Sequence, residues 1–163
     1  MNMHSLAEQI ISECTERKVK VTTAESCTGG MVIAAITSIP GSSAITEMGL
    51  CSYSNRIKTE ILGVSEKTLR EYTEYSIQCA EEMAKGALKI SGADYSVSTT
   101  GIAGPTGGTK DDPVGTVYFA AADKDTVISA RERFEGDRDN VRKAASEKAL
   151  KMLLELITNS KER

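Results

Sequence analysis

Histidine and aromatic residues are scarce in this chain of 163 residues, and each shortage excludes a class of function. The only histidine is His4, so neither a Ser-His-Asp triad nor a histidine-based zinc or iron site can be built. Tryptophan is absent, and five tyrosines and two phenylalanines leave few rings for stacking on bases. A net charge of −3 and a pI near 5.3 also argue against a nucleic acid as partner, because phosphate backbones require clustered basic charge.

Long apolar runs and paired cysteines are missing as well. No run approaches the roughly 20 apolar residues of a membrane-spanning helix, and residues 1–5 lack the charged and apolar regions of a signal peptide. The four cysteines form no Cys-x-x-Cys pair, which indicates reduced thiols rather than disulfides or a zinc site. Cys14 is expected in the core, and Cys27 is the one candidate reactive thiol. We therefore expect a cytoplasmic protein without metal, cofactor, nucleic-acid or membrane partner.

The order of predicted elements points to an α/β fold in a single domain, 1–163, with its core at about 6–157. Apolar residues at helical spacing predict helices at 4–17 and 137–157, and the polar tail from Thr158 is expected to fray. Other expected helices span 28–38, 55–62, 65–72 and 76–90, and expected strands span 19–24, 45–52, 95–99, 116–122 and 127–134. Helices alternating with three strands, followed by a hairpin, predict a three-layer α/β/α sandwich on a mixed five-stranded sheet.

The segment 22–30, Thr-Thr-Ala-Glu-Ser-Cys-Thr-Gly-Gly, stands between a strand-like and a helix-like run. Such a turn places hydroxyls and free N–H groups at a helix N-terminus, where an anion or an activated serine can be held. Ser26 is the candidate nucleophile, and the N–H groups of Thr28, Gly29 and Gly30 are candidates for an oxyanion hole. The same residue types also form ordinary helix caps and tight turns.

Two further polar segments follow predicted strands and are expected to meet Ser26. Tyr53 follows the second strand, and a Gly/Thr-rich loop at 99–108 follows the third. Loops beyond the carboxyl ends of parallel strands gather at one edge of a sheet. A loop of this length is typical of a functional or a disordered segment, and its N–H groups can wrap a phosphate. Its candidate substrate-binding residues are Gly101, Gly104, Thr106, Gly107 and Gly108.

Without a histidine, a nucleophilic Ser26 needs a lysine, a carboxylate or a tyrosine as its base. Lys58 lies about one turn into the predicted helix after the second strand, on a face that can point towards the end of that strand. A lysine acts as a base only if its pKa falls from about 10.4 towards neutrality, through burial or a nearby cation such as Arg138 or Arg142. An ordinary surface lysine is the alternative. Glu25 is another candidate base, unless it bonds backbone N–H groups in the turn.

Six short motifs occur in a characteristic order and spacing. They are Thr-Ala-Glu-Ser-Cys-Thr-Gly-Gly at 23–30, Tyr-Ser-Asn-x-x-Lys at 53–58, Leu-Gly-Val at 62–64, Thr-Gly-Ile-Ala-Gly-Pro-x-Gly-Gly at 100–108, Pro-Val-Gly-Thr-Val at 113–117 and Gly-Asp-Arg at 136–138. Together they resemble the CinA C-terminal domain family over about residues 6–157. The chain is similar to the stand-alone form, without the molybdopterin-binding-like domain that many members carry in front.

This resemblance implies a nicotinamide-nucleotide amidase, which hydrolyses the carboxamide of nicotinamide mononucleotide to nicotinic acid mononucleotide and ammonia. It implies serine–lysine catalysis, with Ser26 as the nucleophile and Lys58 as its base. Tyr53 and Thr100 are implied to assist near the reacting amide. The family fold is again a three-layer sandwich with a mixed five-stranded sheet, and a homodimer or higher homo-oligomer is expected.

For substrate binding, the resemblance assigns a basic residue after the Gly-Asp-Arg motif to the phosphate. Arg142 is the first choice and Arg138 the second, and Glu25 is counted among the substrate-binding residues. Two segments depart from the family pattern: 48–50 reads Met-Gly-Leu where relatives usually have Gly-Gly-Val, and 72–76 reads Tyr-Thr-Glu-Tyr-Ser where they usually have His-Gly-Ala-Val-Ser. Both segments are candidates for lining the site or a subunit contact.

Two other functions remain open from the sequence. One is a non-catalytic nucleotide-binding or regulatory module linked to competence or the DNA-damage response. The other is an amidase that acts on a different nucleotide amide. The combination of Ser26, Tyr53, Lys58 and Thr100 favours chemistry over binding, because a binding module has no need of that combination.

Overall fold

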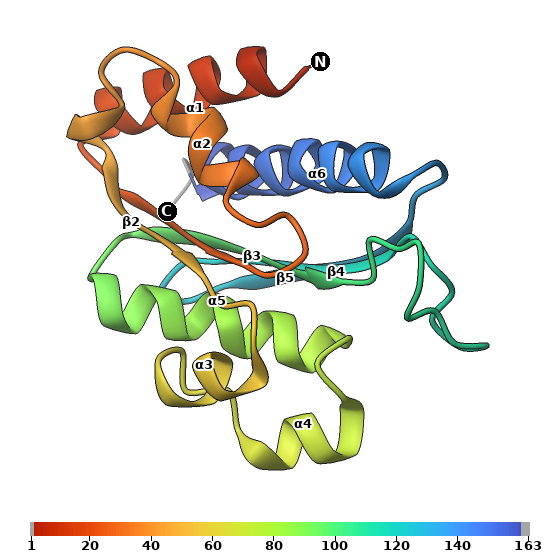
Figure 1. The fold of residues 1–163 in the computed structure, drawn as a ribbon. Coiled ribbons are helices and arrows are strands. Elements are labelled where there is room, and N and C mark those ends of the chain that lie inside the picture. The colour runs from red at the N-terminus through yellow and green to blue at the C-terminus, as the bar shows by residue number, and fades with distance from the viewer. Residues whose placement is uncertain (1, 161–163) are drawn as a thin grey trace.

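In the computed structural model, which describes residues 2–160, a central sheet is covered by helices on both faces (Figure 1). The helices are α1 (Met3–Arg17), α2 (Met31–Thr37), α3 (Asn55–Glu60), α4 (Glu66–Tyr72), α5 (Ile77–Ser91) and α6 (Arg138–Asn159), with a 3-10 turn η1 at Ser42–Ala44. The strands are β1 (Val21–Glu25), β2 (Thr46–Cys51), β3 (Tyr95–Gly101), β4 (Thr116–Ala122) and β5 (Val127–Arg133).

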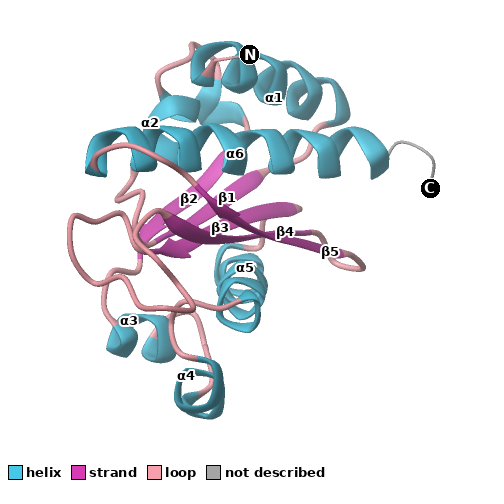
Figure 2. Ribbon diagram, turned by 90° about the vertical axis from the view of Figure 1, so that its right-hand side faces the viewer, coloured by secondary structure: helices cyan, strands magenta, loops and turns pink. Residues whose placement is uncertain are grey.

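The sheet has the order β2-β1-β3-β4-β5 and is mixed. Strands β2, β1 and β3 run parallel, whereas β4 and β5 are antiparallel to their neighbours. Helices α1, α2 and α6 cover one face, and α5 covers the other with α3 and α4 beneath it (Figure 2). The predicted three-layer α/β/α sandwich with a mixed five-stranded sheet is confirmed.

The register of the parallel strands brings their carboxyl ends level with one another. Glu25 at the end of β1 pairs with Cys51 in β2 and with Thr99 in β3. The segments that follow these three strands therefore leave the sheet at a common edge, as the sequence predicted.

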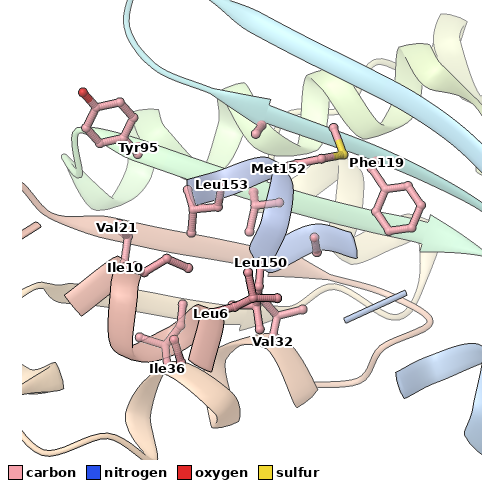
Figure 3. Packing of buried hydrophobic residues seen from close by; sticks show 14 of the residues in the cluster. Leu6, Ile10, Val21, Val32, Ile36, Tyr95, Phe119, Leu150, Met152 and Leu153 are labelled. Atoms are coloured by element: carbon pink, nitrogen blue, oxygen red, sulfur yellow. The ribbon is translucent and has the colours of Figure 1, made fainter. Parts of the chain in front are cut away.

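The main core lies between the sheet and α1, α2 and α6 (Figure 3). In α1, Leu6 and Ile10 stand one helical turn apart and are buried in the same cluster as Val21 of β1 and Leu150 and Leu153 of α6. Fully burying one such aliphatic side chain contributes about 1.5–3 kcal/mol. Every residue of β4 is buried because helices cover both of its faces, whereas the burial of β5 is only partial at the sheet edge.

Several element boundaries differ from the sequence prediction. Helix α2 begins at Met31 rather than at residue 28, because the two glycines before it adopt left-handed backbone angles. Helix α6 continues to Asn159, so Thr158 lies inside a helix, and its hydroxyl donates to the Leu154 carbonyl. The η1 turn was not predicted. No helix within residues 2–160 has the length and apolar character needed to span a bilayer.

Candidate active site

Ser26 is the first residue beyond β1, at the edge where the parallel strands end. Its N–H donates to the Thr99 carbonyl at 2.9 Å, which continues the β1–β3 ladder by one residue. The chain then turns sharply through Gly29 and Gly30, whose φ angles of 60° and 93° suit a residue without a Cβ atom. Ser26 is 7% exposed and is fixed by this turn at the mouth of the sheet.

Glu25 is directed at the N-terminus of α2 rather than at the space beside Ser26. Its carboxylate accepts hydrogen bonds from the N–H groups of Gly30, Val32 and Ile33 at 2.8–3.1 Å, and from the Thr28 hydroxyl at 2.7 Å. A carboxylate here satisfies helix N–H groups that have no partner within the helix. The structure therefore gives Glu25 a capping role and does not bring it to the substrate or to Ser26 as a base.

Two of the three N–H groups proposed for an oxyanion hole at 28–30 already have acceptors in the structure. The Gly30 N–H donates to Glu25, and the Gly29 N–H donates to the Ser26 carbonyl at 3.1 Å. Neither glycine amide is therefore free to stabilise a developing negative charge. Thr28 is fully buried behind the turn, with its hydroxyl bonded to Glu25.

Lys58 meets Ser26 from the other side. Helix α3 begins at Asn55 and is capped by Ser54, whose hydroxyl accepts from the Ile57 N–H. One turn into the helix, the Lys58 side chain extends back over the end of β1. The distance from Lys58 Nζ to Ser26 Oγ is 3.1 Å, and only 1% of the Lys58 surface is exposed. This geometry is the one required of a nucleophile and its base.

The surroundings of Lys58 favour the uncharged amine. Burial lowers the pKa of Lys58 below its ordinary value of about 10.4, and the nearby Cys79, Glu74 and Cys27 side chains oppose this effect only in part. A neutral amine can take the proton of the Ser26 hydroxyl, whereas an ammonium group cannot.

A cavity of about 150 Å³ opens directly above Ser26 and Lys58. It is lined by Ser26, Cys27, Tyr53, Asn55, Lys58, Glu74, Tyr75, Gly101, Ile102, Ala103, Gly104, Thr106, Gly107 and Arg138. Typical small-molecule sites measure roughly 300–1,000 Å³. This cavity is smaller, so it has room for the reacting end of a nucleotide and not for the whole molecule. Two larger hollows, of about 720 and 730 Å³, contain neither Ser26 nor Lys58. Residues 2–160 contain no cluster of three or more His, Cys, Asp or Glu side chains suited to a metal ion.

Cys27 also lines the cavity, but its chemistry does not suit a nucleophile. Burial raises the pKa of the Cys27 thiol to about 12, so the thiolate is scarce near neutral pH. The thiolate is the reactive form of cysteine. Ser26, in contact with a buried amine, is the better candidate of these two neighbours.

The two candidate arginines occupy different positions. Arg138 lines the cavity, where it donates to the Gly104 carbonyl at 2.8 Å and to the Tyr53 hydroxyl at 3.0 Å. Arg142 lies behind the turn instead and donates to the carbonyls of Cys27 and Thr28 at 3.2 and 3.1 Å. Of the two arginines, Arg138 lines the cavity and Arg142 does not.

Thr100 is near the site but does not line the cavity. It is fully buried in β3, and its hydroxyl donates to the Glu74 carbonyl at 2.7 Å, which holds the turn before α5 in place. Tyr53 stands at the rim with 64% of its surface exposed. Of these two predicted assistants, only Tyr53 has a side chain at the cavity.

The glycine-rich loop supplies much of the remaining wall. Of the five candidate binding residues, Gly101, Gly104, Thr106 and Gly107 line the cavity, whereas Gly108 packs against Val114. Within residues 2–160 the N–H groups of Ala103, Gly104, Thr106 and Gly107 have no hydrogen-bond acceptor.

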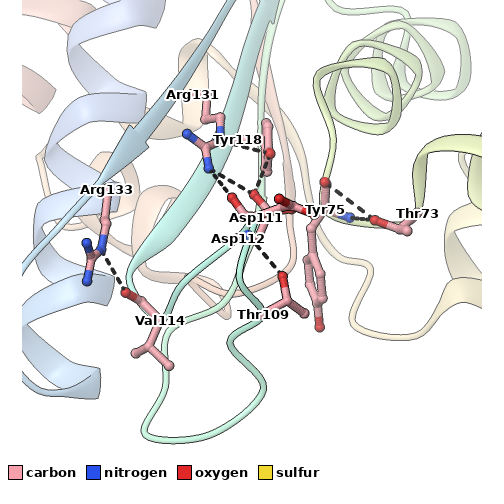
Figure 4. A network of polar contacts seen from close by, with 9 residues as sticks. All are labelled: Thr73, Tyr75, Thr109, Asp111, Asp112, Val114, Tyr118, Arg131 and Arg133. Carbon is pink, nitrogen blue, oxygen red and sulfur yellow. Dashed lines mark hydrogen bonds and ion pairs between the residues drawn. The ribbon is translucent and has the colours of Figure 1, made fainter.

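A polar network anchors this loop to the sheet (Figure 4). The Tyr118 hydroxyl donates to Asp112 at 2.6 Å and accepts from Arg131 Nε at 2.9 Å. Arg131 also donates to the Asp111 carbonyl at 2.7 Å. The outer end of the loop is therefore tied to β4 through the Tyr118 hydroxyl and to β5 through Arg131 and Arg133, which donates to the Val114 carbonyl.

Sequence reasoning did not single out Glu74 and Tyr75 as individual site residues, although both line the cavity. The available signal was the departure of 72–76 from the family pattern. The other departing segment, 48–50, contributes no cavity residue, and its Gly49 packs closely on Ile33 of α2.

The sequence and the fold are similar to those of known proteins. The family model of the CinA C-terminal domain matches residues 3–157. The chain belongs to this family. Its fold superposes on the crystal structure of a competence/damage inducible protein from Agrobacterium tumefaciens with a TM-score of 0.93, at 40% identity and with 96% of each chain covered.

Two relatives show how this CinA C-terminal domain occurs in longer and shorter proteins. The chain is 50% identical over 149 residues to the nicotinamide-nucleotide amidohydrolase PncC of Escherichia coli K12, which covers 91% of this chain and 90% of that relative. It is 46% identical over 155 residues to a longer relative from Caldicellulosiruptor saccharolyticus, of which it spans 38%.

Proposed function

We propose that this protein hydrolyses the carboxamide of nicotinamide mononucleotide to nicotinic acid mononucleotide and ammonia, in the reuse of pyridine nucleotides. The observation that carries the proposal is the 3.1 Å contact between the buried Lys58 amine and the Ser26 hydroxyl, at the floor of a cavity. Relatives of similar length named as nicotinamide-nucleotide amidohydrolases, at 48–50% identity, support the choice of substrate.

In the first half-reaction, neutral Lys58 removes the proton of Ser26 Oγ as that oxygen attacks the carboxamide carbon. The amide C=O opens to an oxyanion, and a C–O bond to Ser26 forms. When the oxyanion collapses, the C–N bond breaks and the Lys58 ammonium gives its proton to the leaving nitrogen. Ammonia departs, and the acyl group remains on Ser26.

In the second half-reaction, Lys58 acts on water in the same way. Neutral Lys58 takes a proton from a water molecule as its oxygen attacks the acyl carbon. The C–O bond to Ser26 then breaks, and Ser26 Oγ recovers a proton from Lys58. Nicotinic acid mononucleotide leaves, and both side chains return to their starting states.

The rest of the cavity provides binding groups for the oxyanion of the intermediate and for the substrate phosphate. The N–H groups of Ala103, Gly104, Thr106 and Gly107, which have no acceptor within residues 2–160, are the donors proposed for the oxyanion. Arg138, at the side of the cavity formed by Gly104, is the residue proposed for the substrate phosphate. Arginine suits this task because its planar donors match phosphate oxygens.

Ammonia release from nicotinamide mononucleotide by purified protein in metal-free buffer tests the proposal. We expect activity that withstands a chelator, a much weaker reaction with nicotinamide riboside, which lacks the phosphate, and none from a Ser26→Ala variant. Equal or faster hydrolysis of another nucleotide amide would reassign the substrate, and activity that a chelator abolishes would contradict the serine–lysine scheme. Light scattering on the same sample tests the expected homo-oligomer.

A further inference from the structure

Glu74 places an unpaired negative charge in the wall of the cavity. It is the one carboxylate among the cavity residues, and within residues 2–160 its side chain has no hydrogen-bond or ion-pair partner. It is also only partly exposed. An unpaired, partly buried carboxylate that faces a binding site is free to interact with a charge on the ligand.

The turn that carries Glu74 is held by several independent contacts. The Glu74 carbonyl accepts from Thr100 in β3, and Ser76 both caps α5 and donates to the Thr73 carbonyl. Thr73 adopts a φ of 67°, in a region that side-chain-bearing residues rarely occupy. The next residue, Tyr75, brings an aromatic ring to the same wall. The backbone that carries these two side chains is thus fixed at the cavity wall.

A carboxylate beside an aromatic ring is a favourable environment for a delocalised cation. The carboxylate attracts the positive charge directly, and the negative face of the ring adds a cation–π attraction. Arg138 stands elsewhere on the cavity wall, against Tyr53 and Gly104. Apart from the Lys58 amine beside Ser26, the cavity therefore offers one carboxylate and one guanidinium group to a ligand that carries a positive ring and a negative phosphate.

From this arrangement we infer that Glu74 and Tyr75 form a cation subsite, which selects carboxamide substrates with a positively charged pyridinium ring over neutral rings of the same shape. The inference rests on the proposed function and narrows its substrate class. It assigns to the segment 72–76 a role in specificity, because both residues belong to that segment.

A competing explanation is that Glu74 acts only through Lys58, whose charge state it influences. The two roles differ in one measurable respect. An effect through Lys58 changes the hydrolysis of every amide by the same factor, whereas a cation subsite changes the ratio between a charged and a neutral substrate.

The experiment compares nicotinamide mononucleotide with its reduced form, a neutral dihydropyridine with the same amide, ribose and phosphate. Both kcat/KM, from ammonia release, and Kd, from calorimetry, are measured for the parent, Glu74→Gln and Glu71→Gln. Glu71 is an exposed carboxylate in the preceding helix that does not line the cavity. The intrinsic reactivity of each amide does not depend on the variant. A change in the ratio of the two kcat/KM values therefore reports on the protein.

We expect Glu74→Gln to reduce the preference for the charged form by about tenfold, chiefly through weaker binding of that form once the carboxylate charge is lost, and Glu71→Gln to leave the preference within twofold. An unchanged preference in Glu74→Gln, in both kcat/KM and Kd, would overturn the inference. If the parent binds the charged form selectively through Glu74 yet releases no ammonia, the cation subsite stands and the proposed hydrolysis is wrong.

Discussion

The Lys58 amine and the Ser26 hydroxyl lie 3.1 Å apart, although the two residues are separated by 32 positions in the chain. Each stands just beyond the end of a neighbouring parallel strand, and both are almost fully buried. The strand register brings the segments together, and the first turn of α3 aims the lysine at the serine. This pair is the basis of the predictions that follow.

Replacement of the nucleophile should abolish turnover. Ser26→Ala removes the attacking oxygen, so kcat should fall about 10³-fold or more. Cys27→Ala is the matched control, because Cys27 is adjacent and also lines the cavity. It should keep kcat within about tenfold of the parent. Steady-state ammonia release measures both variants, and the opposite ranking would make Cys27 the nucleophile.

Substitution of Arg138 should weaken substrate binding, whereas substitution of Arg142 should reduce the stability of the fold. Arg138→Ala should raise KM for nicotinamide mononucleotide by about 10- to 100-fold, with a smaller change in kcat, because a charge-assisted hydrogen bond contributes about 1.5–3 kcal/mol. Arg142→Ala should lower the free energy of unfolding by about 1–2 kcal/mol through its lost bonds to Cys27 and Thr28. Steady-state kinetics and thermal melting test the two variants. A larger rise in KM from Arg142→Ala than from Arg138→Ala would indicate that Arg142 binds the phosphate.

Removal of the buried amine should stabilise the protein in a pH-dependent way. The pKa of Lys58 is lower in the folded protein than the unfolded value of about 10.4, so the unfolded chain binds the proton more tightly. The stability of the parent therefore rises with pH up to about 10.4. Lys58→Met avoids this cost, so it should be more stable by about 1 kcal/mol or more at pH 7. Denaturant unfolding should show the difference shrinking as pH approaches 10, and a constant difference would refute the lowered pKa.

The polar network that ties Asp111 and Asp112 to Tyr118 and Arg131 (Figure 4) should keep the glycine-rich loop ordered at the cavity. Arg131→Ala removes the bonds to Tyr118 and to the Asp111 carbonyl. We expect faster hydrogen exchange over 105–113 and a KM a few-fold higher, with kcat nearly unchanged because the Ser26–Lys58 pair is not touched. Tyr118→Phe, which removes only the hydroxyl, should give a weaker form of the same change. Unchanged exchange in both variants would show that the loop is held by other contacts.

Much of the fold follows from local patterns that the sequence displays openly. Apolar spacing located α1 and α6, and turn residues separated the strands, so the layers and the sheet could be predicted. The starting residue of α2 was missed because the cap is Glu25, which lies several positions upstream and reaches the helix through tertiary geometry. Rules for helix caps consider only the residues next to the helix end, so they do not predict a cap from Glu25.

The site was predictable where sequence position alone fixes the geometry. Ser26 and Lys58 each follow the end of a parallel strand, so their meeting could be expected from topology. Arg138 and Arg142 lie one turn apart on α6, and only the packing of that helix decides which of them reaches the cavity. Glu74 reaches the wall through its bond with Thr100, a contact across 26 residues that no local pattern shows.

The most direct test of the Ser26–Lys58 pair is the pH dependence of kcat/KM for the parent and for Lys58→Arg with nicotinamide mononucleotide. Lys58 must be neutral to act, so parental kcat/KM should rise with pH along a limb whose pKa lies below about 10.4. Arginine keeps the charge but stays protonated, since its pKa exceeds about 12, so Lys58→Arg should bind the substrate yet keep less than about 1% of parental kcat. A Lys58→Arg enzyme with a third of parental kcat, or a parental profile without the rising limb, would show that Lys58 is not the base.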